Sequence, residues 1–202
     1  MYRYVALKFR YILLLLIVMT TGRGCASHTP SRTSIATTTC DNPYTKHIRN
    51  LPGTPNIRVE TSCGDYTFTD KKLVLAISMF VQEYSREFDM DEKAVWKLLS
   101  SLRIELSAIP RTVSGVYDIN GNPIVDAYVT GLALSKDHIW VEIKTSQIWS
   151  SSLAHELVHI IIWRSNQIHG DPDHEGPEFS GWTSKHTQFI KRFNLDLLDL
   201  EI

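Results

Sequence analysis

The chain has 202 residues, of which 43% are apolar, and its formal net charge at pH 7 is −1. This length provides one ordinary globular domain together with a targeting segment. Because lysine and arginine are balanced by aspartate and glutamate, the composition lacks the basic excess of nucleic-acid-binding proteins, and we expect no nucleic-acid partner.

Residues 1–24 have the pattern of a signal peptide. Three basic side chains precede the apolar run YILLLLIVM at residues 11–19. This run is shorter than the roughly 20 apolar residues that a transmembrane helix needs. The sequence TTGRGCAS follows and surrounds Cys25 with small residues.

The segment around Cys25 resembles a bacterial lipoprotein signal, which is cleaved before a cysteine that becomes lipidated. The resemblance implies a membrane anchor on Cys25. Ala26 after this cysteine is the residue that usually accompanies an outer-membrane location in Gram-negative cells. The alternative is an ordinary secretory signal that is cleaved nearby. We therefore expect a protein of the cell envelope that is lipid-anchored or secreted.

Residues 25–39 are rich in serine and threonine and have almost no apolar side chains, which predicts a flexible tether. The domain itself is expected at residues 40–202. If Cys25 carries the lipid, Cys40 and Cys63 remain as an even pair. An exported protein meets an oxidising compartment, so this pair predicts one disulfide, and two separate thiols are the alternative.

The first part of the domain combines short strands with two helices. NIRVETSCGDYTFTD at residues 56–70 alternates enough for one or two strands. From Asp70, the expected N-cap, apolar residues recur at helical spacing as far as Phe88. DEKAVWKLLSSL at residues 91–102 predicts a second, shorter helix that begins near Asp91.

Residues 102–143 predict a small and mostly antiparallel sheet. PIVDAYVTGLAL at 123–134 and HIWVEI at 138–143 have the composition of strands, with a turn at SKD between them. A long apolar helix is expected at about 151–164, and GWTSKHTQFIKRF predicts a final helix capped by Thr183. The succession of N-terminal helices, sheet, central helix and C-terminal helix indicates an α+β fold.

The central helix contains HELVH, residues 155–159. Positions i and i+4 lie one above the other on a helix, so His155 and His159 can present two imidazole nitrogens to one Zn²⁺ ion. Glu156 lies on the same turn beside such an ion, where it can act as general base and then as general acid.

The apolar flanks of HELVH predict that this helix is buried. Each of its three titratable side chains would cost a few kcal/mol if it were buried without a partner, and one metal ion relieves that cost for all three. The alternative is a buried histidine pair that is satisfied by carbonyl groups, with the glutamate at the surface.

A catalytic zinc has three protein ligands and keeps a fourth position for water. The chain after the helix, QIHGDPDHEGPEF, is rich in glycine, proline and aspartate and predicts a turn. His174 follows Pro172 in this turn and has the reach to return to the metal, so we take it as the third ligand. Glu178 and then His169 are the alternatives.

HELVH on a buried helix that follows a sheet resembles the zincin metalloproteases over residues 102–193. It is not the metzincin pattern, because Ile162 and Ser165 occupy the places of its glycine and third histidine. DHEGPEF is more similar to minimal zincins of the SprT-like sort, which favours His174, whereas the gluzincin pattern would use Glu178. The resemblance implies a small zincin-like domain that hydrolyses a peptide or protein substrate.

In zincins the strand before the active helix is commonly an edge strand that pairs with an extended substrate, and residues 138–143 occupy that place in the sequence. An ordinary core strand is the alternative. Two other functions remain open at this point. One is a non-catalytic protein that a closed zinc site stabilises, and the other is an interaction lipoprotein of the cell envelope.

Overall fold

The computed structural model describes residues 35–37, 47–62, 68–113, 116–117, 122–144, 147–166 and 181–200. Several predicted features lie outside these residues: the signal peptide, Cys25, Cys40, Cys63, and the ligand candidates His169, His174 and Glu178. Within the described ranges, no helix has both the length and the apolar character to cross a bilayer.

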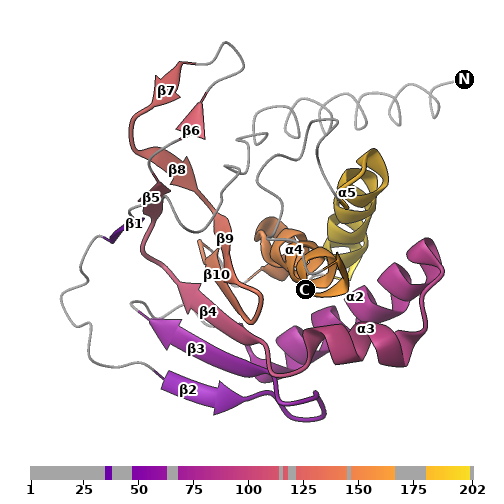
Figure 1. The fold of residues 1–202 in the computed structure, drawn as a ribbon. Coiled ribbons are helices and arrows are strands. Elements are labelled where there is room, and N and C mark those ends of the chain that lie inside the picture. The colour runs from indigo at the N-terminus through magenta and orange to yellow at the C-terminus, as the bar shows by residue number, and fades with distance from the viewer. Residues whose placement is uncertain are drawn as a thin grey trace, which may run out of the picture.

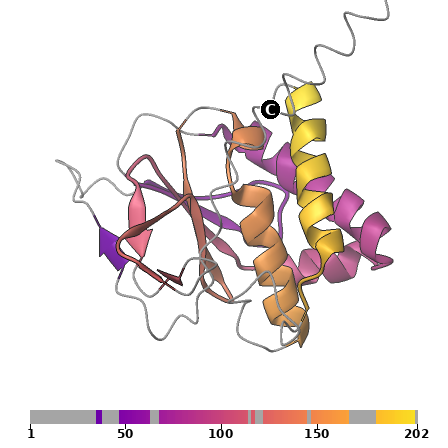
Figure 2. The same cartoon turned by 90° about the horizontal axis from the view of Figure 1, so that it is seen from above.

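A mixed five-stranded sheet forms the centre of the molecule, and four helices lie together on one of its faces (Figures 1 and 2). The sheet has the order β2-β3-β4-β10-β9, with the bounds β2 His47–Asn50, β3 Arg58–Ser62, β4 Arg103–Ser107, β10 His138–Glu142 and β9 Gly131–Ser135. The α+β class predicted from the sequence is confirmed.

Within residues 102–143 the prediction of mostly antiparallel pairing is confirmed, because β9 with β10, residues 111–113 with 127–129, and residues 116–117 with 123–124 are all antiparallel. The five-stranded sheet as a whole is mixed. The central strand β4 is parallel to β3 on one side and to β10 on the other, with Ile104 opposite Val59 and Ile139. Only the outer strands β2 and β9 are antiparallel to their neighbours. For β3 and β4 the reason is that the two first helices lie between them, and such a crossover returns the chain in the same direction.

A smaller antiparallel sheet consists of β1 (Ile35–Thr37), β5 (Arg111–Val113) and β8 (Ala127–Val129). Its first strand comes from the segment that the sequence assigns to the tether. The hairpin β6 (Val116–Tyr117) and β7 (Pro123–Ile124) adjoins it in the chain. The single strand expected at 123–134 is wrong, because a turn with Asp126 at φ 53° separates β7 from β8 and Thr130 separates β8 from β9.

The four helices are α2 (Asp70–Phe88), α3 (Glu92–Leu99), α4 (Leu153–Asn166) and α5 (Ser184–Asp199). The predicted cap at Thr183 is confirmed, since Thr183 forms a capping box with His186. The predicted start of α3 near Asp91 is also confirmed, and the Asp91 carboxylate caps this helix by accepting from the Ala94 N–H. The expected cap of α2 is wrong by one residue. Thr69 is its N-cap, because its side chain accepts from the Lys72 N–H.

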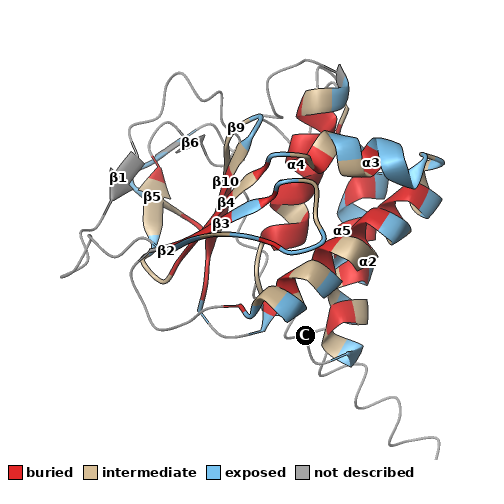
Figure 3. Cartoon of the chain, turned by 90° about the horizontal axis from the view of Figure 1, so that it is seen from below, coloured by how far each residue is buried: buried red, intermediate tan, exposed pale blue. Residues whose placement is uncertain are grey.

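The main core lies between the sheet and the helices, where Figure 3 shows the inward faces of α2, α4 and α5 as buried. The Phe80 ring of α2 meets Phe189 and Phe193 of α5 edge to face, with ring centroids 5.5 and 5.6 Å apart. A second, smaller cluster is built around Trp140 of β10. Since Ile139 and Val141 belong to the main core, Trp140 points to the opposite face of the sheet.

Helix α4 is buried along most of its length, as its apolar flanks predict. Leu157, Val158, Ile160 and Ile161 are each at most 1% exposed. A short 3₁₀ helix, η1 (Ile148–Ser150), leads into α4 and contacts both α2 and α5. The core therefore surrounds the helix that carries the HELVH motif and fixes its rotation about its own axis.

Candidate metal centre

The two histidines of HELVH lie together on one side of α4. Their Nε2 atoms are 3.0 Å apart, and the ring centroids are 4.8 Å apart. His159 is buried and His155 is half-buried. The i, i+4 spacing and the burial of the rest of the helix thus direct both imidazoles to the same point.

This pair fits a zinc ion. Zinc binds imidazole nitrogens at about 2.0–2.1 Å, so two such ligands can be at most about 4 Å apart. The 3.0 Å separation lies within that limit. Among the residues that the structure describes, no group of three or more potential metal ligands occurs. The predicted third-ligand candidates His174, Glu178 and His169 all lie in residues 167–180, outside the described residues.

Trp182 covers both histidines from the start of α5. Its indole ring lies 4.8 Å from the His155 ring and 4.8 Å from the His159 ring, centroid to centroid. The indole N–H donates to the Thr187 hydroxyl at 3.0 Å, which holds the ring on the first turn of α5. The chain therefore returns to the histidine pair directly after the segment with the third-ligand candidates.

Glu156 lies beneath the surface, at 1% exposure, rather than on it. Its Oε1 atom has no hydrogen-bond partner among the described residues, and burial raises the pKa of the carboxyl well above its ordinary value. The alternative of a surface glutamate is therefore wrong. A buried carboxyl oxygen without a partner is expensive in a folded protein and is typical of a functional position.

The carboxylate of Glu156 lies against the first residue of β9. A Cβ atom placed on Gly131 would be 2.3 Å from Glu156 Oε1 and 2.2 Å from Ser152 Oγ. Ser152, just before α4, donates to the Thr130 carbonyl at 2.7 Å. The strand and the start of the helix thus meet at the glutamate.

The edge strand expected at 138–143 is wrong. β10 lies between β4 and β9, and β9 is the outer strand on this side of the five-stranded sheet. The reason is the tight turn at Ser135–His138, which folds β9 back onto β10 in an antiparallel hairpin. The strand next to Glu156 at the sheet edge therefore begins at Gly131.

Another histidine near this region, His186 of α5, has a structural role. Its ring accepts from the Thr183 N–H at Nδ1 and contacts the Tyr84 hydroxyl at Nε2, over 3.0 and 3.2 Å. It also stacks on Phe88, with ring centroids 4.3 Å apart. Burial lowers the pKa of His186 to about 4, so the ring is neutral at physiological pH.

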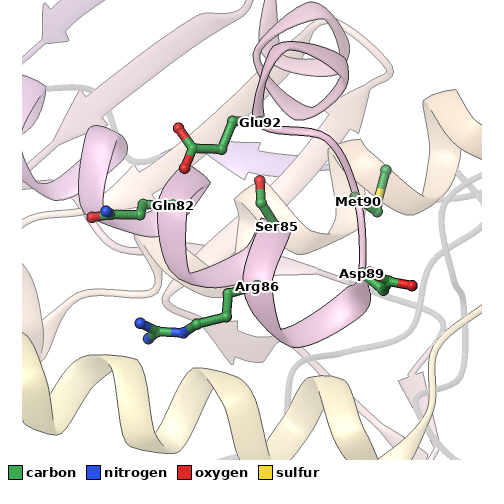
Figure 4. Close-up of a pocket in the computed structure, with 6 residues that line it drawn as sticks. All are labelled: Gln82, Ser85, Arg86, Asp89, Met90 and Glu92. Carbon is green, nitrogen blue, oxygen red and sulfur yellow. The ribbon is translucent and has the colours of Figure 1, made fainter.

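A separate hollow of about 450 Å³ lies at the turn between α2 and α3 (Figure 4). Its lining residues are Gln82, Ser85, Arg86, Asp89, Met90 and Glu92. The Ser85 hydroxyl already donates to the Val81 carbonyl at 2.6 Å, and no histidine is among the lining residues to act as a base. The hollow shares no residue with the HELVH motif.

No protein-family model, curated protein or solved structure matches the chain. Fold and site together define an α+β protein whose central buried helix presents a histidine pair and a buried glutamate. Three residues of this site were not among the sequence candidates: Gly131, Ser152 and Trp182. The glycine was visible in principle, since a glycine inside a strand pattern often marks a close approach of another group.

Proposed function

We propose that the chain is a zinc-dependent peptidase of the zincin type, exported to the cell envelope and anchored through Cys25. The observation that carries the proposal is the meeting of the His155 and His159 Nε2 atoms, 3.0 Å apart, on the helix that also buries Glu156. A pair of structural histidines has no need of a buried carboxyl beside it. A hydrolytic centre needs such a carboxyl as its general base.

His155 and His159 are the proposed protein ligands from α4. The third is His174, with Glu178 and His169 as alternatives, so that one position stays open for water. When bound, zinc supplies a Lewis acid that polarises the scissile carbonyl and makes water nucleophilic near neutral pH. Trp182 packs against both imidazoles and restricts their rotation.

Glu156 is the proposed general base and general acid. Its carboxylate accepts a proton from the attacking water and delivers this proton to the leaving amine nitrogen. A general base works best when its pKa is near the operating pH, and burial raises the pKa of Glu156 in that direction.

Strand β9 supports a peptide or protein as the substrate. In the described part of the sheet, β9 pairs with β10 alone, and its first residue touches Glu156. An extended peptide that adds to this edge forms main-chain hydrogen bonds and passes beside the carboxylate. The strand addition expected at 138–143 is therefore transferred to Gly131–Ser135.

The proposal is tested by zinc content and peptide hydrolysis measured on the same samples. We expect about one zinc per chain and cleavage of a fluorogenic peptide library by the wild type. Glu156→Gln should retain zinc and lose hydrolysis, whereas His159→Gln should lose both. His138→Gln is the matched control, because His138 lies on β10 and contacts Glu105 instead of the motif. It should retain both properties.

Two results would contradict the proposal. Stoichiometric zinc without any hydrolysis indicates a closed site that only stabilises the fold. Absence of zinc from a protein that folds normally indicates an interaction protein in which the motif binds no metal. If the wild type does bind zinc, the zinc contents of three variants identify the third ligand: His174→Gln, Glu178→Gln and His169→Gln.

The anchor is tested separately from the chemistry. A chain expressed with its own signal should partition with membranes, and Cys25→Ala should release it into the soluble fraction or block its processing. A wild-type chain found only in the medium would contradict lipidation and support simple secretion.

A further inference from the structure

Gly131 faces Glu156 at the junction of sheet and helix, and any side chain there would occupy the space of the carboxylate. A Cβ atom would lie 2.2 Å from Ser152 Oγ, 2.3 Å from Glu156 Oε1 and 2.9 Å from Glu156 Cδ, all under the 3.0 Å limit that real Cβ contacts observe. The backbone of Gly131 is not left-handed, so alanine meets no conformational obstacle there. The glycine is therefore needed for space alone.

Ser152 fixes the other side of the same junction. Its hydroxyl donates to the Thr130 carbonyl at 2.7 Å, and this carbonyl also accepts from the Glu142 N–H at 2.8 Å. The Ser152 carbonyl in turn accepts from the Glu156 N–H at 3.0 Å. One chain of hydrogen bonds thus joins β10, the start of β9, the start of α4 and the backbone of the glutamate.

We infer that Gly131 and Ser152 are positioning residues for the Glu156 carboxylate. Ser152 holds the first turn of α4 on the strand, and Gly131 leaves the cavity into which the carboxylate fits. This inference rests on the proposed function for its catalytic meaning. Neither residue touches the imidazoles in the described contacts, so their replacement should change the rate of the chemical step and leave zinc binding intact.

The first test is Gly131→Ala in the zinc-loaded, full-length protein. Displacement of a catalytic group by about 1 Å costs on the order of 10²-fold in rate. We therefore expect kcat to fall by about that factor, with zinc content unchanged and KM within about threefold. Ser152→Ala should lower kcat in the same direction by a smaller factor, because it removes one hydrogen bond and adds no atom.

The decisive comparison repeats Gly131→Ala in a Glu156→Asp background. Aspartate is one methylene shorter and withdraws its carboxylate from Gly131, so the added methyl group should then lower kcat by a smaller factor than in the wild type, with only the Ser152 hydroxyl still in its way. A loss of kcat by the same factor in both backgrounds would show that the two positions are independent and would overturn the inference. Gly53→Ala is the control for general destabilisation, since Gly53 has φ +72° and no heavy atom within 4 Å of the place that a methyl group would take.

A second readout does not depend on activity. In the presence of a chelator, Gly131→Ala should lower Tm by about 2–12 °C, as expected for overpacking in a chain of this size. In a Glu156→Ala background the same change should lower Tm by less, because the carboxylate is gone and only the Ser152 hydroxyl still lies in the way of the methyl group. Equal losses of Tm in both backgrounds would contradict the contact itself.

These two readouts separate the two proposals. If the wild type hydrolyses no peptide but the Tm values are coupled, the proposed function is wrong and the positioning of Glu156 by Gly131 is supported. If neither kcat nor Tm is coupled, the inference is wrong, whatever the outcome for zinc and hydrolysis.

Discussion

Replacement of Glu156 by methionine should stabilise the metal-free protein. The carboxyl is 1% exposed, and its Oε1 atom has no hydrogen-bond partner among the described residues. A buried polar group without a partner costs about 1–3 kcal/mol, and methionine fills a similar volume without this cost. We therefore expect the free energy of unfolding to rise by about 1–3 kcal/mol at pH 4. For a chain of this length, the corresponding increase in Tm is about 2–12 °C.

This gain in stability should increase with pH. The ordinary pKa of glutamate is 4.5, and burial raises the pKa of Glu156 well above it. Between these two pKa values, the unfolded chain releases the proton while the folded chain retains it. The wild type therefore loses about 1.4 kcal/mol per pH unit in this window, and methionine has no proton to lose. The stability difference between the two chains should thus grow from pH 4 to pH 6.

The assay is urea unfolding of both chains at pH 4, 5 and 6 in the presence of a chelator. Because the other titratable groups are common to both chains, their contributions cancel in the difference. Glu92→Met is the control, since Glu92 is an exposed residue in the first turn of α3, and its loss should destabilise by no more than about 1 kcal/mol. A Glu156→Met protein that is no more stable than the wild type at any of these pH values would refute the reasoning from burial.

Three further predictions concern the scaffold around the site. The pKa of His186 is 6.5 in the unfolded chain and about 4 in the folded chain. As the pH falls from 6.5 to 4, only the unfolded chain takes up the proton, so the free energy of unfolding of the wild type should fall by at most about 3 kcal/mol. His186→Gln keeps a capping-box residue and should abolish this loss, as urea titrations at pH 4.5 and 7 can show. Arg164→Ala should cost about 1–3 kcal/mol in urea unfolding, because its guanidinium donates to the Leu98 and Ser100 carbonyls at the end of α3. Phe189→Ala should cost about 3–5 kcal/mol by the same measurement, and a cost below about 1 kcal/mol would contradict its place in the core.

The central helix and its histidine pair could be predicted because their information is local. The apolar residues on either side of HELVH fix the burial of α4, and the i, i+4 spacing fixes the meeting of His155 and His159. The cap of α5 at Thr183 and the start of α3 near Asp91 were visible for the same reason. At α2 the local signal was ambiguous, since Thr69 and Asp70 are both good caps and only one can precede the first helical residue.

The order of the strands could not be predicted in this way. β4 pairs with β3, whose first residue is Arg58, and with β10, whose first residue is His138, and both pairings are parallel. Periodicity shows which residues form a strand but does not show which distant strand lies beside it. Gly131 illustrates the same limit at the site, because its close approach to Glu156 depends on the hairpin that puts β9 at the edge.

The parallel pairing of β3 with β4 also bears on how short a fragment of this protein can be and still fold. The proposed zincin-like unit spans residues 102–193, but a fragment that begins at residue 102 would start with the central strand β4 and would lack its neighbour β3. The backbone amides and carbonyls of β4 that pair with β3 would be left without partners, and they could pair with a strand of another molecule. The fragment would also lack α2, whose Phe80 closes the hydrophobic interior against α5. We therefore expect the HELVH helix to keep its fold only in a fragment that retains β3 and α2 together with the later elements.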